Sequence, residues 1–418
     1  MISSNLFLIS FYTFAIIGLI IKLYLNYKNI AYIAKHSDSV PEIFKEKITL
    51  EEHKTAAKYT ITKQKFSTST MVIHFLLLIL WVPVGGLNQL DLLVQRFDLS
   101  QIQSGLVFFL AYMVISIVIS LPESIYSTFV IEEKFGFNKT TPKLFCLDFL
   151  KQLLLSTILG GVLLYTLLYL MNFLGENWWL FAWCFIVLFQ FVIIWAYPKF
   201  IAPIFNKFSP LDDDDLKNQI EKLSKNINLN FKDYYIMNAS LRSSHGNAYF
   251  TGFGKNKRIV FFDTLLKTLT NNEVMAVLAH ELGHLKKKHI LKSLFIGILF
   301  MGIGFYVLGL LLDSKEFFMA FGNSTPSSHM ALILFTFLLP IYTFILTPLS
   351  SWFSRKNEYE ADQFAVENTN GDELISALIK MYKDNSSSLT PSPVFSKFYY
   401  SHPPAIERVN FINSVKNK

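Results

Sequence analysis

The pentapeptide HELGH at residues 280–284 carries three side chains that can form a hydrolytic metal centre. On a helix, His280 and His284 project from one face with about 5–6 Å between their Cβ atoms, which suits two imidazole ligands of one zinc ion. Glu281 follows the first histidine, and in this motif such a glutamate takes a proton from the attacking water. The pattern therefore predicts a zinc-dependent hydrolase.

The residues around the pentapeptide are typical of an amphipathic helix. Thr270 and Glu273 have the spacing of a capping box, which marks a helix N-terminus. The lysines at 286–288 complement the negative C-terminal end of the helix dipole. Apolar residues recur on one face, at Val274, Val277, Leu278, Leu282 and Leu285. A chance match on a surface helix remains the alternative until a third ligand is found.

A catalytic zinc ion with two histidine ligands needs a third protein ligand and an open position for water. The polar segment RKNEYEAD at 355–362 offers three carboxylates. On a helix, Glu358 and Asp362 share a face, which allows Glu358 to bind the metal while Asp362 accepts a hydrogen bond from a ligating histidine. Glu360 is expected to point elsewhere. Without the pentapeptide, a solvated charged helix would be the better interpretation.

The other histidines are weaker candidates for chemistry. His289 is off the ligand face of the predicted helix, and we expect it at the membrane interface. His74 lies inside an apolar run, where it can pair with a neighbouring helix. His245 and His402 have no specific pattern of their own. None of the four would be chosen as a ligand from spacing alone.

Composition points to a membrane protein. Of 418 residues, 52% are hydrophobic and 17% charged, and the mean hydropathy is +0.37. The net charge of +7 could suggest nucleic acid, but the lysines cluster between apolar runs, and no basic-aromatic motif occurs. We therefore expect no nucleic-acid partner. The two cysteines, Cys146 and Cys184, form neither a disulfide framework nor a metal pair.

Seven stretches are long and apolar enough to cross a bilayer, which takes roughly 17 to 25 residues of helix. The first lacks the basic start and small-residue cleavage site of a signal peptide, and we expect it to be retained. The seven predicted spans are residues 6–25, 69–87, 105–121, 153–174, 178–197, 294–312 and 330–349.

Basic residues alternate from side to side along these spans. Residues 26–68 carry eight lysines and residues 122–152 carry four, whereas Arg96 and Lys315 stand alone in two of the loops on the other side. Because lysine and arginine favour the cytoplasmic side, we expect the N-terminus outside and the C-terminus in the cytoplasm. The membrane would be a bacterial inner membrane or the endoplasmic reticulum, depending on the source.

The largest polar insert is predicted to be a small α+β unit that faces the cytoplasm. Residues 231–237 and 258–262 have the β-branched and aromatic side chains of short strands. Asn247, Ala248, Tyr249 and Phe250 form a third possible strand. The acidic run at 212–215 precedes a helical pattern.

The predicted fold is mainly α and polytopic, with seven transmembrane helices and a zincin-like α+β metalloprotease domain on the cytoplasmic side. The predicted parts are a membrane region at 1–197, a catalytic insert at 198–289, two further spans at 290–349 and a C-terminal part at 350–418. Two spans separate His284 from Glu358. Because two crossings return the chain to the side it left, both residues can meet at one membrane face.

Several motifs together resemble the type I CaaX prenyl endopeptidases, a family of seven-span membrane zinc metalloproteases. Most of these motifs have no role in a generic zinc site, and together they cover nearly the whole chain. They are EKFGFNKTTPKLF from Glu133, IAPIFNKFSPL from Ile201, RSSHGNAYFTGFGKNKRIVFFDTLL from Arg242, HELGH, SRKNEYEAD from Ser354 and YSHPPAIERV from Tyr400.

The resemblance implies roles for individual residues. His280, His284 and Glu358 would bind one zinc ion, Glu281 would be the catalytic carboxylate, and Asp362 would support a ligating histidine. The family fold implies seven helices around a large intramembrane chamber, closed at its cytoplasmic end by the zinc domain.

The resemblance also implies how a substrate is bound. His402 would approach the site and stabilise the oxyanion of the tetrahedral intermediate. Asn247, Ala248 and Tyr249 would lie along the substrate cleft, where an edge strand can pair with an extended peptide. The substrate would be a peptide or protein, yet no feature of this sequence demands a prenyl group, and membrane-protein quality control is the other role considered. The sequence leaves the oligomeric state open.

Three alternatives remain from sequence. A transporter or chamber scaffold could hold a structural or vestigial zinc, although a closed structural site has four protein ligands and no use for Glu281. An intramembrane protease of the site-2 type places its motif within an apolar span, whereas here Asn271, Asn272 and three lysines flank the helix. A four-span heat-shock membrane protease shares the motif but not the length or the number of spans.

Overall fold

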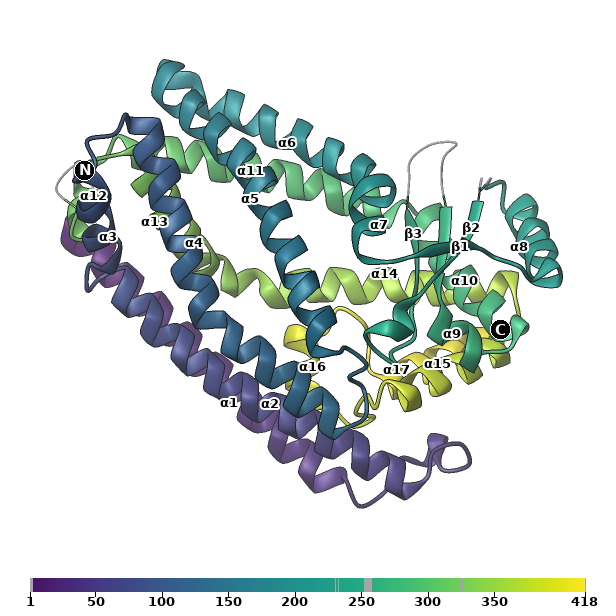
Figure 1. Cartoon of the computed structure of the whole chain (residues 1–418). Coiled ribbons are helices and arrows are strands. Elements are labelled where there is room, and N and C mark those ends of the chain that lie inside the picture. The colour runs from purple at the N-terminus through teal and green to yellow at the C-terminus, as the bar shows by residue number, and fades with distance from the viewer. Residues whose placement is uncertain (1–2, 230, 232, 252–257, 324–325, 418) are drawn as a thin grey trace.

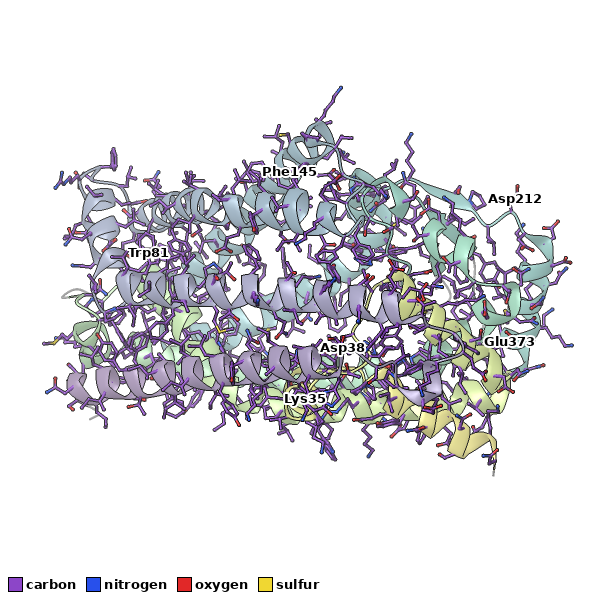
Figure 2. All side chains as sticks on the ribbon, turned by 90° about the horizontal axis from the view of Figure 1, so that it is seen from below. Lys35, Asp38, Trp81, Phe145, Asp212 and Glu373 are labelled. Carbon is purple, nitrogen blue, oxygen red and sulfur yellow. The ribbon has the colours of Figure 1, made fainter. Side chains whose placement is uncertain are left out.

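The long apolar helices form one half of the molecule and a small α+β domain forms the other. This computed structural model describes residues 3–229, 231, 233–251, 258–323 and 326–417. Figure 1 shows the long helices gathered on one side, with the strands and short helices at the end opposite the N-terminus. Figure 2 places Trp81 at one end of the molecule, and Asp212 and Glu373 at the other.

Within the described residues, six helical stretches are long and apolar enough to span a membrane, and a bent helix pair makes a seventh. This confirms the predicted class of fold. The helices of the membrane half are α1 (Ser4–His36), α2 (Leu50–Trp81), α3 (Gly86–Gln95), α4 (Gln101–Tyr126), α5 (Pro142–Phe173), α6 (Trp178–Ala196), α11 (His289–Leu312), α12 (Lys315–Ala320) and α13 (Ser328–Thr343).

The second predicted span is the bent pair. Helices α2 and α3 meet at an angle of 51°, and Pro83 lies in the break between them. Proline cannot supply the backbone N–H that would continue α2. Gly85 then adopts φ +91°, a left-handed conformation that glycine reaches without a steric penalty. The bend thus follows from two residues of the sequence.

Helix α13 continues almost directly into the α+β half. A 3₁₀ turn at Phe344–Leu346 joins it to α14 (Thr347–Asn368), which carries Glu358 and Asp362. The seventh span therefore extends as a helix to the predicted third ligand.

The α+β half contains a four-stranded sheet in the order β1-β2-β4-β3. Strands β2 and β4 are parallel, and β1 and β3 flank them in antiparallel pairing. The prediction for β4 is confirmed, β2 begins two residues later than predicted, and β1 was missed because three residues carry no periodic signal. The strands are β1 (Phe208–Pro210), β2 (Asp233–Met237), β3 (Ala248–Thr251) and β4 (Arg258–Phe262).

Short helices cover the sheet and form a hydrophobic core around α10. Helix α10 packs against α14 and α15, and α17 packs against the same two helices. These helices are α7 (Ala202–Phe205), α8 (Asp214–Asn226), α9 (Asp263–Thr268), α10 (Asn271–Lys286), α15 (Gly371–Asp384), α16 (Pro393–Tyr399) and α17 (Ala405–Lys416).

A separate buried polar group lies in the membrane half. Asp91 on α3 pairs with His329 on α13, with 2.7 Å between Asp91 Oδ1 and His329 Nε2. Gln95 donates its amide N–H to the other oxygen of Asp91 at 2.8 Å. Both oxygens of this buried carboxylate are therefore satisfied.

Candidate metal centre

Helix α10 presents the two histidines of the pentapeptide to α14. Its first turn has the predicted capping box, in which Thr270 and Glu273 exchange hydrogen bonds. Gly283 faces α14 closely, because a Cβ atom added there would lie 3.0 Å from Cα of Ala361. The absent side chain lets the two helices approach at the level of the histidines.

Three side chains converge at this contact: His280, His284 and Glu358. The Nε2 atoms of the two histidines are 3.3 Å apart. Glu358 Oε2 lies 3.4 Å from Nε2 of His280, and Glu358 Oε1 lies 3.2 Å from Nε2 of His284. The residues predicted as ligands are thus brought together from α10 and α14.

The donor set fits a tetrahedral metal ion. Two ligand atoms about 2.0–2.1 Å from such an ion are separated by roughly 3.4 Å, close to the 3.3 Å between the histidine Nε2 atoms and to the 3.2–3.4 Å from each of them to the nearer oxygen of Glu358. In addition, Glu358 Oε2 is fully buried and accepts no hydrogen bond of acceptable geometry. A buried acceptor without a donor is costly unless another group, such as a cation, satisfies it.

Asp362 and Arg408 support His280. The Nδ1 atom of His280 lies 2.8 Å from Asp362 Oδ1, and Arg408 donates from Nε to Asp362 Oδ2 at 2.9 Å. Asp362 is 0% exposed. Burial alone would raise the pKa of Asp362, but the Arg408 guanidinium and the hydrogen bond from His280 hold it below its usual range. Asp362 is therefore a carboxylate that can orient His280, as the sequence predicts.

A second pair of residues supports His284, and the sequence analysis missed it. His289 is buried rather than interfacial, and its Nδ1 lies 3.0 Å from Nδ1 of His284. Its Nε2 lies 3.1 Å from Oε2 of Glu360, the carboxylate expected to point elsewhere. The expectation for His289 was wrong because it assumed that α10 continues through that residue, whereas the helix ends at Lys286.

Glu281 lies beside the candidate ligands. It lines a cavity of about 340 Å³ together with His280, Asn247 and His402. Within the part of the chain that the structure describes, Glu281 takes part in no recorded hydrogen bond or ion pair. Its carboxylate is thus available to a molecule in this cavity.

His402 reaches the metal centre from the loop before α17. Its Nδ1 lies 2.7 Å from Oε2 of Glu358, and its side chain is 63% exposed. The neighbouring Arg408 also approaches Glu358, with 3.8 Å between Nη1 and Oε2. Sequence reasoning named His402 only through the resemblance, and it missed Arg408, although both lie in the YSHPPAIERV motif.

The predicted cleft residues occupy the edge of the sheet. Among the residues that the structure describes, β3 pairs with β4 alone, so its other side is a sheet edge. Asn247 lines the metal-centre cavity, and Ala248 packs against the hydrophobic core. The side chain of Tyr249 lines a different pocket with Tyr235 and Arg258, where burial raises its pKa to about 12. Residues 252–257 of this motif lie outside the described residues.

A series of cavities leads from the metal centre toward the membrane helices. The cavity at Glu281 shares Tyr382, Asn385 and His402 with a neighbouring cavity of about 660 Å³. That cavity in turn shares Gln64 and Tyr400 with one of about 850 Å³ between α1, α2 and α13. The largest of the three is lined mainly by apolar side chains.

The sequence and fold match known proteins along most of the chain. Residues 29–207 match the family described as CAAX prenyl protease N-terminal, five membrane helices, and residues 210–416 match peptidase family M48. The CAAX prenyl protease 1 homolog of Homo sapiens is 36% identical, over 76% of this chain and 75% of the human protein. CAAX prenyl protease 1 of Saccharomyces cerevisiae is 33% identical, over 94% and 92% of the two chains.

A solved structure has the same fold. The crystal structure of S. mikatae Ste24p is similar with a TM-score of 0.91 and 29% identity, over 97% of this chain and 99% of that chain. The likeness therefore includes the membrane helices as well as the catalytic half. Together, the family matches, the relatives and this structure show that the chain belongs to the CAAX prenyl protease 1 family of integral-membrane M48 metalloproteases.

Proposed function

We propose that this membrane metalloprotease binds one zinc ion through His280, His284 and Glu358. The observation that carries the proposal is the convergence of His280, His284 and Glu358: the two Nε2 atoms are 3.3 Å apart, and each lies 3.2–3.4 Å from a different oxygen of the Glu358 carboxylate. Two imidazoles and one carboxylate are a ligand set of catalytic zinc. Zinc bound there supplies Lewis acidity to an attacking water and to the scissile carbonyl.

Glu281 is the proposed base and acid of the reaction. It accepts a proton from the attacking water on a carboxylate oxygen while the water oxygen bonds to the peptide carbon. It then delivers that proton to the leaving nitrogen as the C–N bond breaks, so that the products are a carboxylate and an amine. His402 donates a hydrogen bond to the oxyanion of the tetrahedral intermediate.

Asn247, Ala248 and Tyr249 provide the proposed binding edge for substrate. An extended peptide that adds to β3 places its backbone beside the cavity that Asn247 shares with Glu281. The structure supports this role through the backbone for Ala248 and Tyr249, whose side chains face elsewhere. Asp362 is proposed to hold the tautomer and ring plane of His280.

The proposed substrate is a peptide or membrane-associated protein with a prenylated cysteine near its C-terminus, followed by the residues that are removed. The names of the relatives describe prenyl proteases, and the mainly apolar cavity of about 850 Å³, which adjoins the site through the cavity of about 660 Å³, has room for a lipid chain. The lysine-rich loops favour a cytoplasmic position for the catalytic half and the C-terminus. We propose four parts of the chain: a membrane region at 1–197, a catalytic insert at 198–289, two further spans at 290–349 and a C-terminal part at 350–418.

Matched peptides test this proposal. Purified protein is given the same peptide in farnesylated and bare forms, with Glu281→Ala as the blank. We expect the farnesylated peptide to be cleaved with the larger kcat/KM, and the variant to cleave neither peptide above the level seen without protein. Equal cleavage of the two peptides would remove prenyl recognition, and cleavage by the variant at the wild-type rate would remove Glu281 from the mechanism.

A further inference from the structure

The second histidine of the candidate metal centre is held by a chain of two contacts. Nδ1 of His284 lies 3.0 Å from Nδ1 of His289, and Nε2 of His289 lies 3.1 Å from Oε2 of Glu360. The two imidazole rings meet edge to face, with their centroids 5.1 Å apart. His289 is 3% exposed, so these contacts are shielded from competing water.

The backbone explains how His289 comes back to His284. Helix α10 ends at Lys286, and Lys288 then adopts φ +58°. This left-handed conformation reverses the chain before α11 begins at His289. The imidazole at the start of the sixth span is thereby turned toward the last turn of α10.

Glu360 provides the last of these contacts, and it lies on another helix, α14. It lies two residues after Glu358 on α14 and therefore projects from a different face. Glu358 faces the metal centre, while Glu360 faces the first residue of α11. Its side chain is 35% exposed, unlike that of Glu358, which is 4% exposed.

The hydrogen atoms along the His284–His289–Glu360 contacts can be assigned so that each N–H group faces an acceptor. Nε2 of His284 faces Glu358 and His280, so its lone pair is the one available to the metal. A neutral imidazole then carries its hydrogen on Nδ1 and donates it to Nδ1 of His289. His289 in turn carries its hydrogen on Nε2 and donates it to the Glu360 carboxylate.

We propose that His289 and Glu360 are positioning residues that fix the tautomer and ring plane of His284 for metal binding. The inference rests on the proposed function, because it assigns the same metal centre a support on the His284 side. It parallels Asp362 on the His280 side, but here the link passes through a second imidazole. It also ties a candidate ligand to the contact between the first residue of α11 and α14.

An alternative assigns the pair a purely structural role, as a link between α11 and α14. That role would change the stability of the fold but not the release of metal from the folded protein. Metal release therefore distinguishes the two interpretations. Substituting such an indirect partner of a ligand typically lowers metal affinity by about 10–100-fold.

The test measures how fast zinc leaves the full chain. Wild type, His289→Ala, Glu360→Ala and the double variant are purified in detergent and loaded with Zn²⁺, and transfer to a chromophoric chelator is followed. Glu367→Ala is the matched control, since it removes an equal charge from α14, and its recorded side-chain partner is Gln363. Glu360→Ala covers the case in which His289→Ala does not fold, because the side chain of Glu360 is far less buried than that of His289.

We expect His289→Ala to release zinc about 10-fold faster than wild type, and Glu360→Ala several-fold faster. The double variant should be no faster than His289→Ala, because Glu360 acts through His289. The control should stay within about two-fold of wild type. Release at the wild-type rate by both single variants would overturn the inference, as would multiplied effects in the double variant. A wild-type protein that holds no zinc would instead refute the proposed function.

Discussion

The two ends of the molecule bury polar side chains in different ways. At the membrane end, the carboxylate of Asp91 has a hydrogen-bond partner on each oxygen, His329 and Gln95. At the catalytic end, Glu358 is equally buried, yet one of its oxygens accepts no hydrogen bond of acceptable geometry. A complete set of partners indicates a structural tie, whereas an incomplete set indicates a place for a ligand.

The difference extends to the helices themselves. In the most apolar window of α11, 6% of the residues are buried inside the protein, because the others are expected to face lipid. Helix α10 is far less apolar, but it is buried along most of its length, including Glu273 and His280. Helix α10 thus buries paired polar groups within an apolar core, whereas most of α11 lies outside the protein interior.

The largest effect is expected for Glu281→Ala. This change removes the free carboxylate of the catalytic end without touching a candidate ligand. Cleavage should fall by about 10²–10⁴-fold, the usual contribution of a general acid-base group, while zinc content stays at the wild-type level. Cleavage assays and metal analysis of the same sample check both points. A parallel loss of zinc would show that Glu281 acts on the metal site itself.

Asp362→Ala should have the next largest effect. It leaves the Arg408 guanidinium buried beside Glu358 without its main partner. Breaking a buried pair in this way costs about 3–5 kcal/mol of stability. Thermal unfolding in detergent measures the loss, with Gln363→Ala on the same helix as the control. A variant that unfolds at the wild-type temperature would contradict the pairing described here.

Glu273 links α10 to α15 and should give a smaller, pH-dependent effect. Burial would raise its pKa, but hydrogen bonds from Lys380, Thr270 and Ser376 outweigh burial and lower it. A lowered pKa in the folded state adds stability that is present above the unfolded pKa of about 4.3 and is lost as pH falls through the folded pKa.

Glu273→Gln removes that contribution. We expect a cost of about 1–3 kcal/mol at pH 7, and a smaller difference from wild type at a pH below the folded-state pKa of Glu273, where the wild type also loses the interaction. Melting curves at the two pH values make the comparison. A difference that is the same at both would mean that the charge of Glu273 does not stabilise the fold.

The smallest effect is expected at the membrane end. Hydrogen bonds between membrane helices contribute about 0.6 kcal/mol on average and at most about 1.7, so Asp91→Asn should lower stability by an amount in that range. Peptide cleavage should be unchanged, because the pair is structural. If Asp91→Asn lost cleavage ten-fold at unchanged stability, the Asp91–His329 pair would have a functional role and not only a structural one.

Much of the fold could be predicted because it depends on local patterns. The spans follow from runs of apolar residues, and the start of α10 follows from the Thr270 and Glu273 box. Two helical spacings, His280 with His284 and Glu358 with Asp362, placed the side chains that the structure brings together. The even number of spans between these pairs predicted that they meet at one membrane face.

The remainder depends on single backbone angles and on distant contacts. His289 was assigned to the wrong environment because the left-handed angle of Lys288 ends the helical periodicity, and no pattern in the sequence predicts that angle. Arg408 lies on α17, and its contact with Asp362 appears only when α14 and α17 pack together. Strand β1 has three residues, too few for an alternating pattern.

Metal content of the Glu358→Ala variant tests the central claim most directly. The claim is that two membrane crossings bring Glu358 back to His280 and His284 as the third ligand of one zinc ion. We predict one zinc per chain in wild type and in Glu281→Ala, and a large loss in Glu358→Ala when all three are dialysed against the same chelator. One tightly held zinc in Glu358→Ala would contradict the account.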